Sequence, residues 1–228
     1  MTVTGTVNEI KDKNGQTAYS LTGDDGASHN GVWDLSLFQA VPHLQMHAPR
    51  DGVQLRRALE QCVSISDGPT MIRFPKGALP PVLHAIESAS DGAEVLYRTG
   101  IDVLIIGVGS MAGLACDVAQ LLDESGFAST VVDPVVIKPL PRSIVNLAAS
   151  VQMVVSIEDG ILIGGVGAAI SDLLETNGVH QPRMSFGVRD EFLVHSPRPV
   201  ALAEQGLRSD TVAAEIQQRL AQLHTRSG

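Results

Sequence analysis

Short runs of β-branched and aliphatic residues alternate with stretches of helical periodicity from about residue 101 onwards. This alternation predicts strands over residues 102–109, 129–133, 152–157 and 183–186, separated by helices over residues 111–124, 142–150 and 165–175. A last amphipathic helix is predicted over residues 210–223, where apolar residues recur at helical spacing: Val212, Ile216, Leu220 and Leu223. Such regular alternation indicates an α/β fold with a mostly parallel sheet.

The segment from residue 23 to residue 78 has shorter elements and polar, glycine-containing loops. It predicts a helix over residues 52–63, opened by Asp51 as N-cap, and a strand over residues 70–74. So few elements do not make a stable domain alone. We therefore expect an unpaired strand edge and exposed apolar surface in this segment.

Two further stretches carry no regular pattern. Residues 79–100 contain Pro80-Pro81 and a run rich in Ser, Asp and Gly, which favours a linker. Residues 1–22 match neither half and are expected to form an irregular extension. The main domain is then expected over residues 101–228.

Composition narrows the class of protein. The 228 residues include 16 Lys and Arg against 25 Asp and Glu, a formal net charge of −9, which disfavours nucleic acid as a partner. The longest apolar runs are far shorter than the roughly 20 residues that cross a bilayer. Cys62 and Cys116 build no disulfide framework, and the first residues show no export signal. We expect a folded, cytoplasmic protein without a membrane span.

A glycine-rich turn between a predicted strand and a predicted helix is the first candidate site. Gly107 to Ala112 reads G-x-G-x-x-A, and Asp133 ends the next strand, as in dinucleotide-binding folds. The alternative is that any tight strand-to-helix turn needs small residues. A second glycine run, Gly164 to Gly167, also precedes a helix, but no Lys, Ser or Thr stands where a phosphate loop requires it, which favours close helix packing.

Two polar motifs offer acid–base and anion-binding chemistry. Asp25, His29 and Asn30 lie on a loop bracketed by glycines, where side chains can converge on a small polar substrate. A solvated turn with an incidental histidine is the alternative, and no second His or Cys stands at metal-ligand spacing. Arg73 follows a predicted strand, where a guanidinium can bind a phosphate or carboxylate or form a surface ion pair.

Several segments, read in order, resemble one enzyme family. They are GDDGASHNGVWDLSLFQAVP, APRDGVQLRRAL, DGPTMIRFPKG, DVLIIGVGSMAGLA, TVVDPVVIKPLP, SIEDGILIGGVGAAI and FGVRDEFLVHSPRPVALAEQGLRSDTVAAEI. Their order and spacing are similar to those of the 1-deoxy-D-xylulose-5-phosphate synthases, which are thiamine-diphosphate-dependent members of the transketolase family. The resemblance runs from about Leu21 to about Leu220.

The resemblance implies a division of the chain and roles for the candidate residues. Residues 23–78 would be the last part of a pyrimidine-binding α/β domain, and residues 101–228 a transketolase C-terminal domain. The family's D-G-x-x-H-x-G loop lines the substrate channel, so Asp25 and His29 would contact the hydroxyl and carbonyl groups of the reacting adduct. Arg73 would hold the phosphate of glyceraldehyde 3-phosphate, and Asn30 would contribute to substrate binding. In the family, the turn at Gly107 binds no cofactor.

The resemblance also implies a cofactor that this sequence has no visible means to bind. The family holds thiamine diphosphate and Mg²⁺ with a Gly-Asp-Gly motif and a downstream Asn, and no Gly-Asp-Gly occurs here. The glutamate that activates the cofactor lies upstream of the matched region. Where the family usually has an Arg before its D-G-x-x-H loop, Ala18, Tyr19 and Ser20 stand instead.

We therefore predict the C-terminal third of such a synthase, inactive or nearly so by itself. Its substrate would be a small phosphosugar, and it would form a homodimer or bind an N-terminal partner chain. The alternatives are one subunit of a split thiamine enzyme, a non-catalytic dimerisation or regulatory module, and an NAD-binding module built on Gly107 to Ala112.

Overall fold

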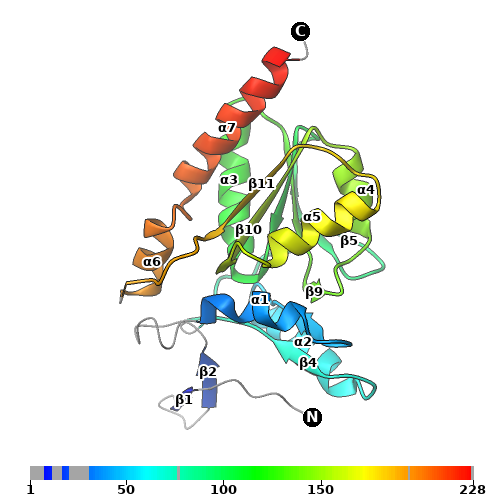
Figure 1. The fold of residues 1–228 in the computed structure, drawn as a ribbon, viewed down its shortest axis with the longest axis vertical. Coiled ribbons are helices and arrows are strands. Elements are labelled where there is room, and N and C mark those ends of the chain that lie inside the picture. The colour runs from blue at the N-terminus through cyan, green and yellow to red at the C-terminus, as the bar shows by residue number, and fades with distance from the viewer. Residues whose placement is uncertain (1–7, 12–16, 21–30, 76–77, 195, 227–228) are drawn as a thin grey trace.

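The computed structural model describes residues 8–11, 17–20, 31–75, 78–194 and 196–226, and its largest element is a six-stranded sheet (Figure 1). The strand order is β11-β10-β7-β8-β6-β5. Four neighbouring strands are parallel, namely β11 (Arg183–Val188), β10 (Met153–Ile161), β7 (Val103–Gly107) and β8 (Ser129–Asp133). The last two are antiparallel, β6 (Glu94–Arg98) and β5 (Glu87–Ser88). The predicted α/β class and mostly parallel sheet are confirmed.

Helices cover both faces of this sheet, which explains why its central strands β7 and β10 are buried throughout. On one face lie α3 (Ala112–Glu124), which follows a short 3-10 turn, η2 (Gly109–Met111), and α7 (Ser209–Arg226); on the other lie α4 (Ser143–Ala149) and α5 (Val166–Thr176). Side chains of β7 alternate between the two cores, so that Ile105 packs with α3 and Ile106 with α5. The predicted elements are thus found within a few residues of their expected bounds.

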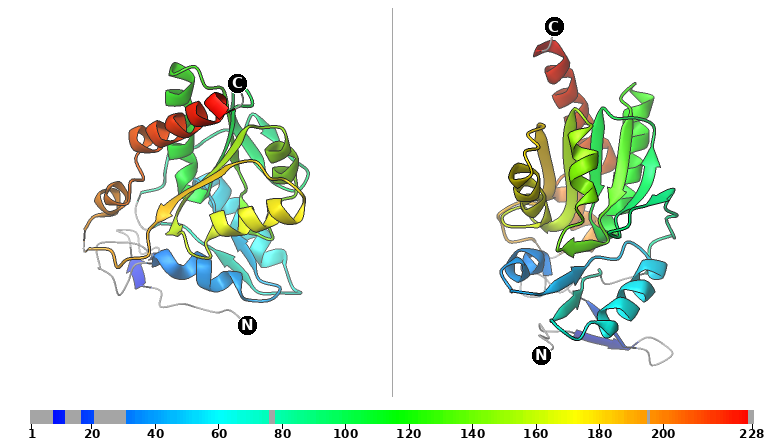
Figure 2. Two further views of the ribbon diagram at one scale, coloured as in Figure 1. Left: turned by 45° about the horizontal axis from the view of Figure 1, so that its top comes forward. Right: turned by 90° about the vertical axis from the view of Figure 1, so that its right-hand side faces the viewer.

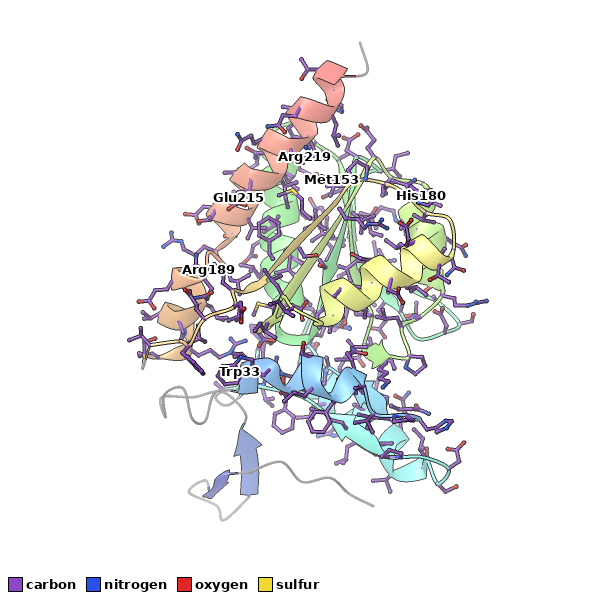
Figure 3. All side chains as sticks on the ribbon, viewed as in Figure 1. Trp33, Met153, His180, Arg189, Glu215 and Arg219 are labelled. Carbon is purple, nitrogen blue, oxygen red and sulfur yellow. The ribbon has the colours of Figure 1, made fainter. Side chains whose placement is uncertain are left out.

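The last helix has the predicted core-facing stripe. Val212, Ile216 and Leu220 are buried against α3 and the sheet, and Leu223 is half-buried. The opposite side of α7 is polar, and Figure 3 shows Glu215 on that outer side, whereas Met153 lies inside the sheet. A shorter helix, α6 (Arg198–Glu204), precedes it.

A second, three-stranded sheet lies against the carboxyl ends of the first (Figure 2). Its order is β4-β3-β9, formed by β3 (Gln45–His47), β4 (Thr70–Ile72) and β9 (Val136–Lys138). The helices of this part are η1 (Gly31–Trp33), α1 (Asp34–Gln39) and α2 (Gly52–Ser64). Asp51 caps α2 as predicted, accepting hydrogen bonds from the backbone of Val53 and Gln54.

The two sheets share one hydrophobic core. Leu35 and Met46, from the smaller part, pack in the same cluster as Leu104 and Ile170 of the larger part. Strand β9, which lies far from β3 in the sequence, also belongs to the smaller sheet and pairs antiparallel with β3. Residues 31–75 are therefore built into the larger domain rather than tethered to it.

The structure differs from the linker expected over residues 79–100. Strands β5 and β6 lie within this range and extend the large sheet. The run of Ser, Asp and Gly that suggested a linker is the hairpin turn between them, where Gly92 has φ +96°. The irregular extension expected over residues 1–22 also differs, because β1 (Asn8–Lys11) and β2 (Thr17–Ser20) pair antiparallel.

A buried arginine joins the smaller part to the large sheet. Arg50 lies between two carboxylates, at 2.8 Å from Asp133 of β8 and 2.6 Å from Glu94 of β6, and it also donates to the carbonyl of Leu83. Burial opposes the charge of Arg50, but the bonds to both carboxylates outweigh it and raise its pKa. Gln54 of α2 adds a hydrogen bond to Glu94 at 2.7 Å.

Removing the Arg50 charge should destabilise the fold strongly. We expect Arg50→Met to lower the free energy of unfolding by about 3–5 kcal/mol, because Asp133 and Glu94 would stay buried without a counter-charge. Chemical denaturation measures this, with the exposed Arg56→Met as matched control, expected within about 0.5 kcal/mol of wild type. A loss below about 1 kcal/mol for Arg50→Met would contradict the role assigned to this ion pair.

Candidate functional site

Arg73 lies at the junction of the two sheets rather than on the surface. It follows β4, its side chain is 4% exposed, and its guanidinium contacts carboxylates from both parts of the molecule. Nε is 3.4 Å from Asp34 of α1, while the terminal nitrogens donate to the side chain and backbone carbonyl of Asp159. In this arrangement the arginine already has anionic partners.

The charges at this junction form a chain from Asp34 through Arg73 and Asp159 to Arg198. Arg198, at the start of α6, donates to Asp159 at 2.5 Å and to the hydroxyl of Ser110 at 2.9 Å. Burial opposes ionisation of Asp159, but the two arginines outweigh it and lower its pKa to about 2. Burial dominates at Asp34, whose pKa is raised. The site can thus hold two guanidinium groups at one buried carboxylate.

Glu158 places a carboxylate at the N-terminus of α5. Its oxygens accept hydrogen bonds from the backbone nitrogens of Val166 and Gly167, at 3.0 and 2.8 Å. Burial raises the pKa of Glu158 to about 7, and these hydrogen bonds only partly offset the effect. A Cβ at Gly165 would lie 2.7 Å from the same carboxylate. The second glycine run therefore serves close packing, as the sequence favoured, and a carboxyl group of the chain accepts the hydrogen bonds at this helix end.

The dinucleotide-like turn is filled by protein. A Cβ at Gly107 would lie 2.8 Å from Ala112 and Ala115 of α3, so this glycine allows the helix to approach the strand. Gly109 has φ +54° and packs on Ala48 of the smaller part. Asp133, expected at a ribose in a nucleotide-binding site, is fully buried and bonded to Arg50. The geometry contradicts the NAD-binding alternative.

The other candidates from the sequence are not placed by the structure. Asp25, His29 and Asn30 lie outside the described residues, so their convergence with Arg73 stays a prediction. Sequence reasoning missed Asp34 and Asp159 as partners of Arg73. A signal was present for both, because each is an acid beside apolar residues, Asp34 before Leu35 and Asp159 near the end of an apolar strand.

Family models match most of the chain. Residues 92–212 match the transketolase C-terminal domain, and residues 16–82 match the transketolase pyrimidine-binding domain. This chain belongs to the transketolase family. The Arg50 and Arg73 ion pairs therefore connect the regions matched by the two models.

Curated relatives narrow the similarity within the transketolase family. A 1-deoxy-D-xylulose-5-phosphate synthase from Corynebacterium glutamicum is 44% identical over 206 residues, which cover 86% of this chain and 32% of the relative. A protein of the same name from Kitasatospora griseola is 46% identical over 197 residues, 86% of this chain and 30% of the relative. The chain spans about a third of the length of the curated relatives it matches.

Solved structures of the transketolase family share this fold. A chain described as a split gene transketolase, inactive β4 tetramer, is 30% identical with a TM-score of 0.73, and the match covers 86% of this chain and 63% of that one. A transketolase from Pichia stipitis is 22% identical with a TM-score of 0.68, covering 87% of this chain and 28% of that one.

The transketolase family depends on thiamine diphosphate. In the described part of the chain, no group of three or more His, Cys, Asp or Glu side chains is placed to hold a metal ion. Within the same part, no helix is both long and apolar enough to cross a membrane.

Glu158 should make stability depend on pH. Its folded pKa of about 7 lies above the ordinary 4.5, so the native state binds the extra proton in this window, and the free energy of unfolding falls as pH rises through it. Glu158→Gln has no charge to bury. As the pH rises from about 5 to about 7.5, we expect the unfolding free energy of the wild type to fall relative to that of Glu158→Gln by about 1–3 kcal/mol.

Chemical denaturation at both pH values measures the Glu158 effect. The matched control is Glu60→Gln on the exposed side of α2, for which the difference should stay constant within about 0.5 kcal/mol. A difference for Glu158→Gln that is the same at both pH values would show that this carboxyl does not titrate as stated.

Proposed function

We propose that this chain is the C-terminal third of a 1-deoxy-D-xylulose-5-phosphate synthase, carrying part of the substrate site but not the cofactor site. The parent reaction would be the thiamine-diphosphate-dependent condensation of pyruvate with glyceraldehyde 3-phosphate. The observation that carries the proposal is 44% identity over 86% of this chain to a relative of which the match spans only 32%.

The proposal retains the roles predicted for the four candidate residues. Asp25 and His29 would move protons at the hydroxyl and carbonyl oxygens of the adduct, with Asn30 binding substrate beside them. Arg73 would bind the phosphate, which requires it to share or release one of its bonds to Asp34 and Asp159. A phosphate dianion bound by Arg73 would take the place of one of the carboxylates that now contact its guanidinium group.

The same proposal covers the domain division, the partner and the compartment. Residues 23–78 act as the remaining part of a pyrimidine-binding domain and residues 101–228 as the C-terminal domain. The partner would be a second copy of this chain or an N-terminal partner chain that carries the cofactor site, and the split gene neighbour supports a partner chain. Cys62 and Cys116 are both free, in keeping with the cytoplasm.

A second candidate function is a non-catalytic module that mediates dimerisation or regulation. The split gene neighbour favours keeping this candidate, because that chain is described as an inactive β4 tetramer and so assembles with itself. A module of this kind would bind neither thiamine diphosphate nor glyceraldehyde 3-phosphate under any combination of chains.

The purified chain alone should neither bind the cofactor nor turn over pyruvate. We expect no heat on calorimetric titration with thiamine diphosphate and Mg²⁺, and no product from pyruvate with glyceraldehyde 3-phosphate. Adding the N-terminal two thirds of the Corynebacterium glutamicum relative should restore cofactor binding and turnover. Micromolar binding and turnover by the chain alone would overturn the proposal, and a stable but inactive complex would favour the non-catalytic module.

A further inference from the structure

A cavity of about 370 Å³ lies between helix α2 and the β5–β6 hairpin. This volume is in the range of pockets that bind small molecules. One wall comes from α2, and the other comes from residues 82–85 together with β5 and β6, where His84 and Ser88 are exposed. The described residues that line it do not include Arg73 or the carboxylates that contact Arg73. The cavity is therefore separate from the candidate functional site.

The inner wall of the cavity consists of buried ion pairs and hydrogen bonds. Arg50 lies 2.6 Å from Glu94 and donates to the backbone carbonyl of Leu83. Asp51 caps α2 and also accepts a hydrogen bond from the backbone nitrogen of Leu83, at 3.1 Å. Because these contacts fix the wall in position, a ligand would not have to order it, which lowers the entropic cost of binding.

Two oxygen atoms on the inner wall keep acceptor capacity. Gln54 is 3% exposed and its Nε2 donates to Oε2 of Glu94, but no hydrogen bond among the described residues engages its Oε1. Oε1 of Glu94 lies 3.6 Å from Nη1 of Arg57, which is longer than a hydrogen bond. Both oxygens can therefore accept hydrogen bonds from an occupant of the cavity, and a group with several N–H donors satisfies both.

The charges around the cavity favour a cation at these two oxygens. The carboxylates of Asp51, Glu94 and Asp133 outnumber the guanidinium groups of Arg50 and Arg57 by one in this cluster. In a partly enclosed space this excess negative charge attracts a positive group more strongly than it would in bulk water. An ammonium group has the required charge and three N–H donors.

Arg57 places an anion-binding group directly beside the inner wall. Its side chain is 60% exposed, and among the described residues its guanidinium makes no hydrogen bond. A guanidinium binds a carboxylate through two parallel hydrogen bonds. Because Arg57 and Glu94 are neighbours, the cavity offers a site for an anion next to a site for a cation. An α-amino acid carries its ammonium and carboxylate groups on one carbon atom, which matches this arrangement.

The remaining lining residues include apolar side chains. Val53 of α2 and Val82 of the opposite wall are 44% and 46% exposed, and Ala85 lies on the same wall as Val82. An aliphatic side chain between the two valines would remove apolar surface of both from water. The apolar lining thus favours an amino acid with an aliphatic side chain over one with a charged side chain.

We propose that this cavity binds a small aliphatic α-amino acid. The ammonium group of the ligand donates to Oε1 of Gln54 and Oε1 of Glu94, and its carboxylate accepts hydrogen bonds from Arg57. The aliphatic side chain packs between Val53 and Val82. The ligand contacts both α2 and the β5–β6 hairpin, so its binding stabilises the contact between the smaller part and the large sheet. This inference goes beyond the proposed function and does not depend on it.

Calorimetry on the purified chain measures this binding, with L-leucine as the probe. We expect one site per chain with a dissociation constant of about 1 mM or lower. Saturating L-leucine should also raise the thermal unfolding midpoint by about 2 °C or more. The matched ligands are isopentylamine, which is leucine without its carboxylate, and 4-methylpentanoate, which is leucine without its amino group. Each should bind about tenfold more weakly or worse, because it leaves one charged group of the cavity unpaired.

Two variants test the residues that contact the ligand. Arg57→Met removes the carboxylate-binding group from an exposed position and should weaken L-leucine binding by about tenfold. The matched control is Arg56→Met, the neighbouring exposed arginine, which is not among the lining residues and should change the dissociation constant by less than about twofold. Gln54→Met removes one acceptor of the ammonium group and should also weaken binding by about tenfold. Thermal unfolding without ligand shows whether each variant folds, and Arg57→Met should unfold at the wild-type midpoint.

Four results would overturn the amino-acid site. They are no binding of L-leucine up to about 50 mM, equal affinity for isopentylamine, equal affinity for 4-methylpentanoate, and unchanged affinity of folded Arg57→Met. Equal affinity for 4-methylpentanoate would mean that Arg57 binds any carboxylate and that the inner wall binds no ammonium group. Weaker binding of both analogues, together with a loss of affinity in Arg57→Met that Arg56→Met does not show, would support the site.

Discussion

Buried pairing between arginines of the smaller part and carboxylates of the large sheet is the constraint on which the rest of this structure depends. Arg50 and Arg73 each enter the junction from residues 31–75, and each binds an acid at or near the carboxyl end of a strand, Asp133 on β8 and Asp159 on β10. A buried arginine or carboxylate that lost its partner would remain as an uncompensated charge, which strongly destabilises the fold. These ion pairs fix where α1, α2 and β4 lie relative to the large sheet.

The strongly periodic part of the fold could be predicted from the sequence, and the junction could not. Short runs of β-branched and aliphatic residues and helices with a long apolar stripe can be recognised in a sequence, as the segment from β7 to β11 shows. Three-residue strands such as β3 and β9 have too few positions to show a period, and they form only because the shared core holds them together. The hairpin at Gly92 could not be predicted for a related reason, because tight turns and linkers are rich in the same residue types, Ser, Asp and Gly.

The candidate site shows the same division between chemistry and placement. Residue type indicated that Arg73 binds an anion, and the structure shows carboxylates of the protein around it. Arg73 is separated along the chain by 39 positions from Asp34 and by 86 positions from Asp159. No local sequence pattern encodes contacts over such separations. The glycine runs were similarly ambiguous, because a backbone that approaches a phosphate and one that approaches a helix both require a residue without a Cβ. At Gly107 the close packing of Ala115 decides in favour of the helix.

The hydrophobic cluster that joins both sheets has a consequence for cooperativity. Leu35 and Met46 occupy the same core as Leu104, so opening either part exposes apolar surface of the other. The boundary between the two family regions is therefore not a boundary between folding units. Both regions should melt in one transition, and a truncation at that boundary would leave the C-terminal domain with an uncovered sheet end prone to association. The residues that precede the boundary are thus part of the folding unit of the C-terminal domain.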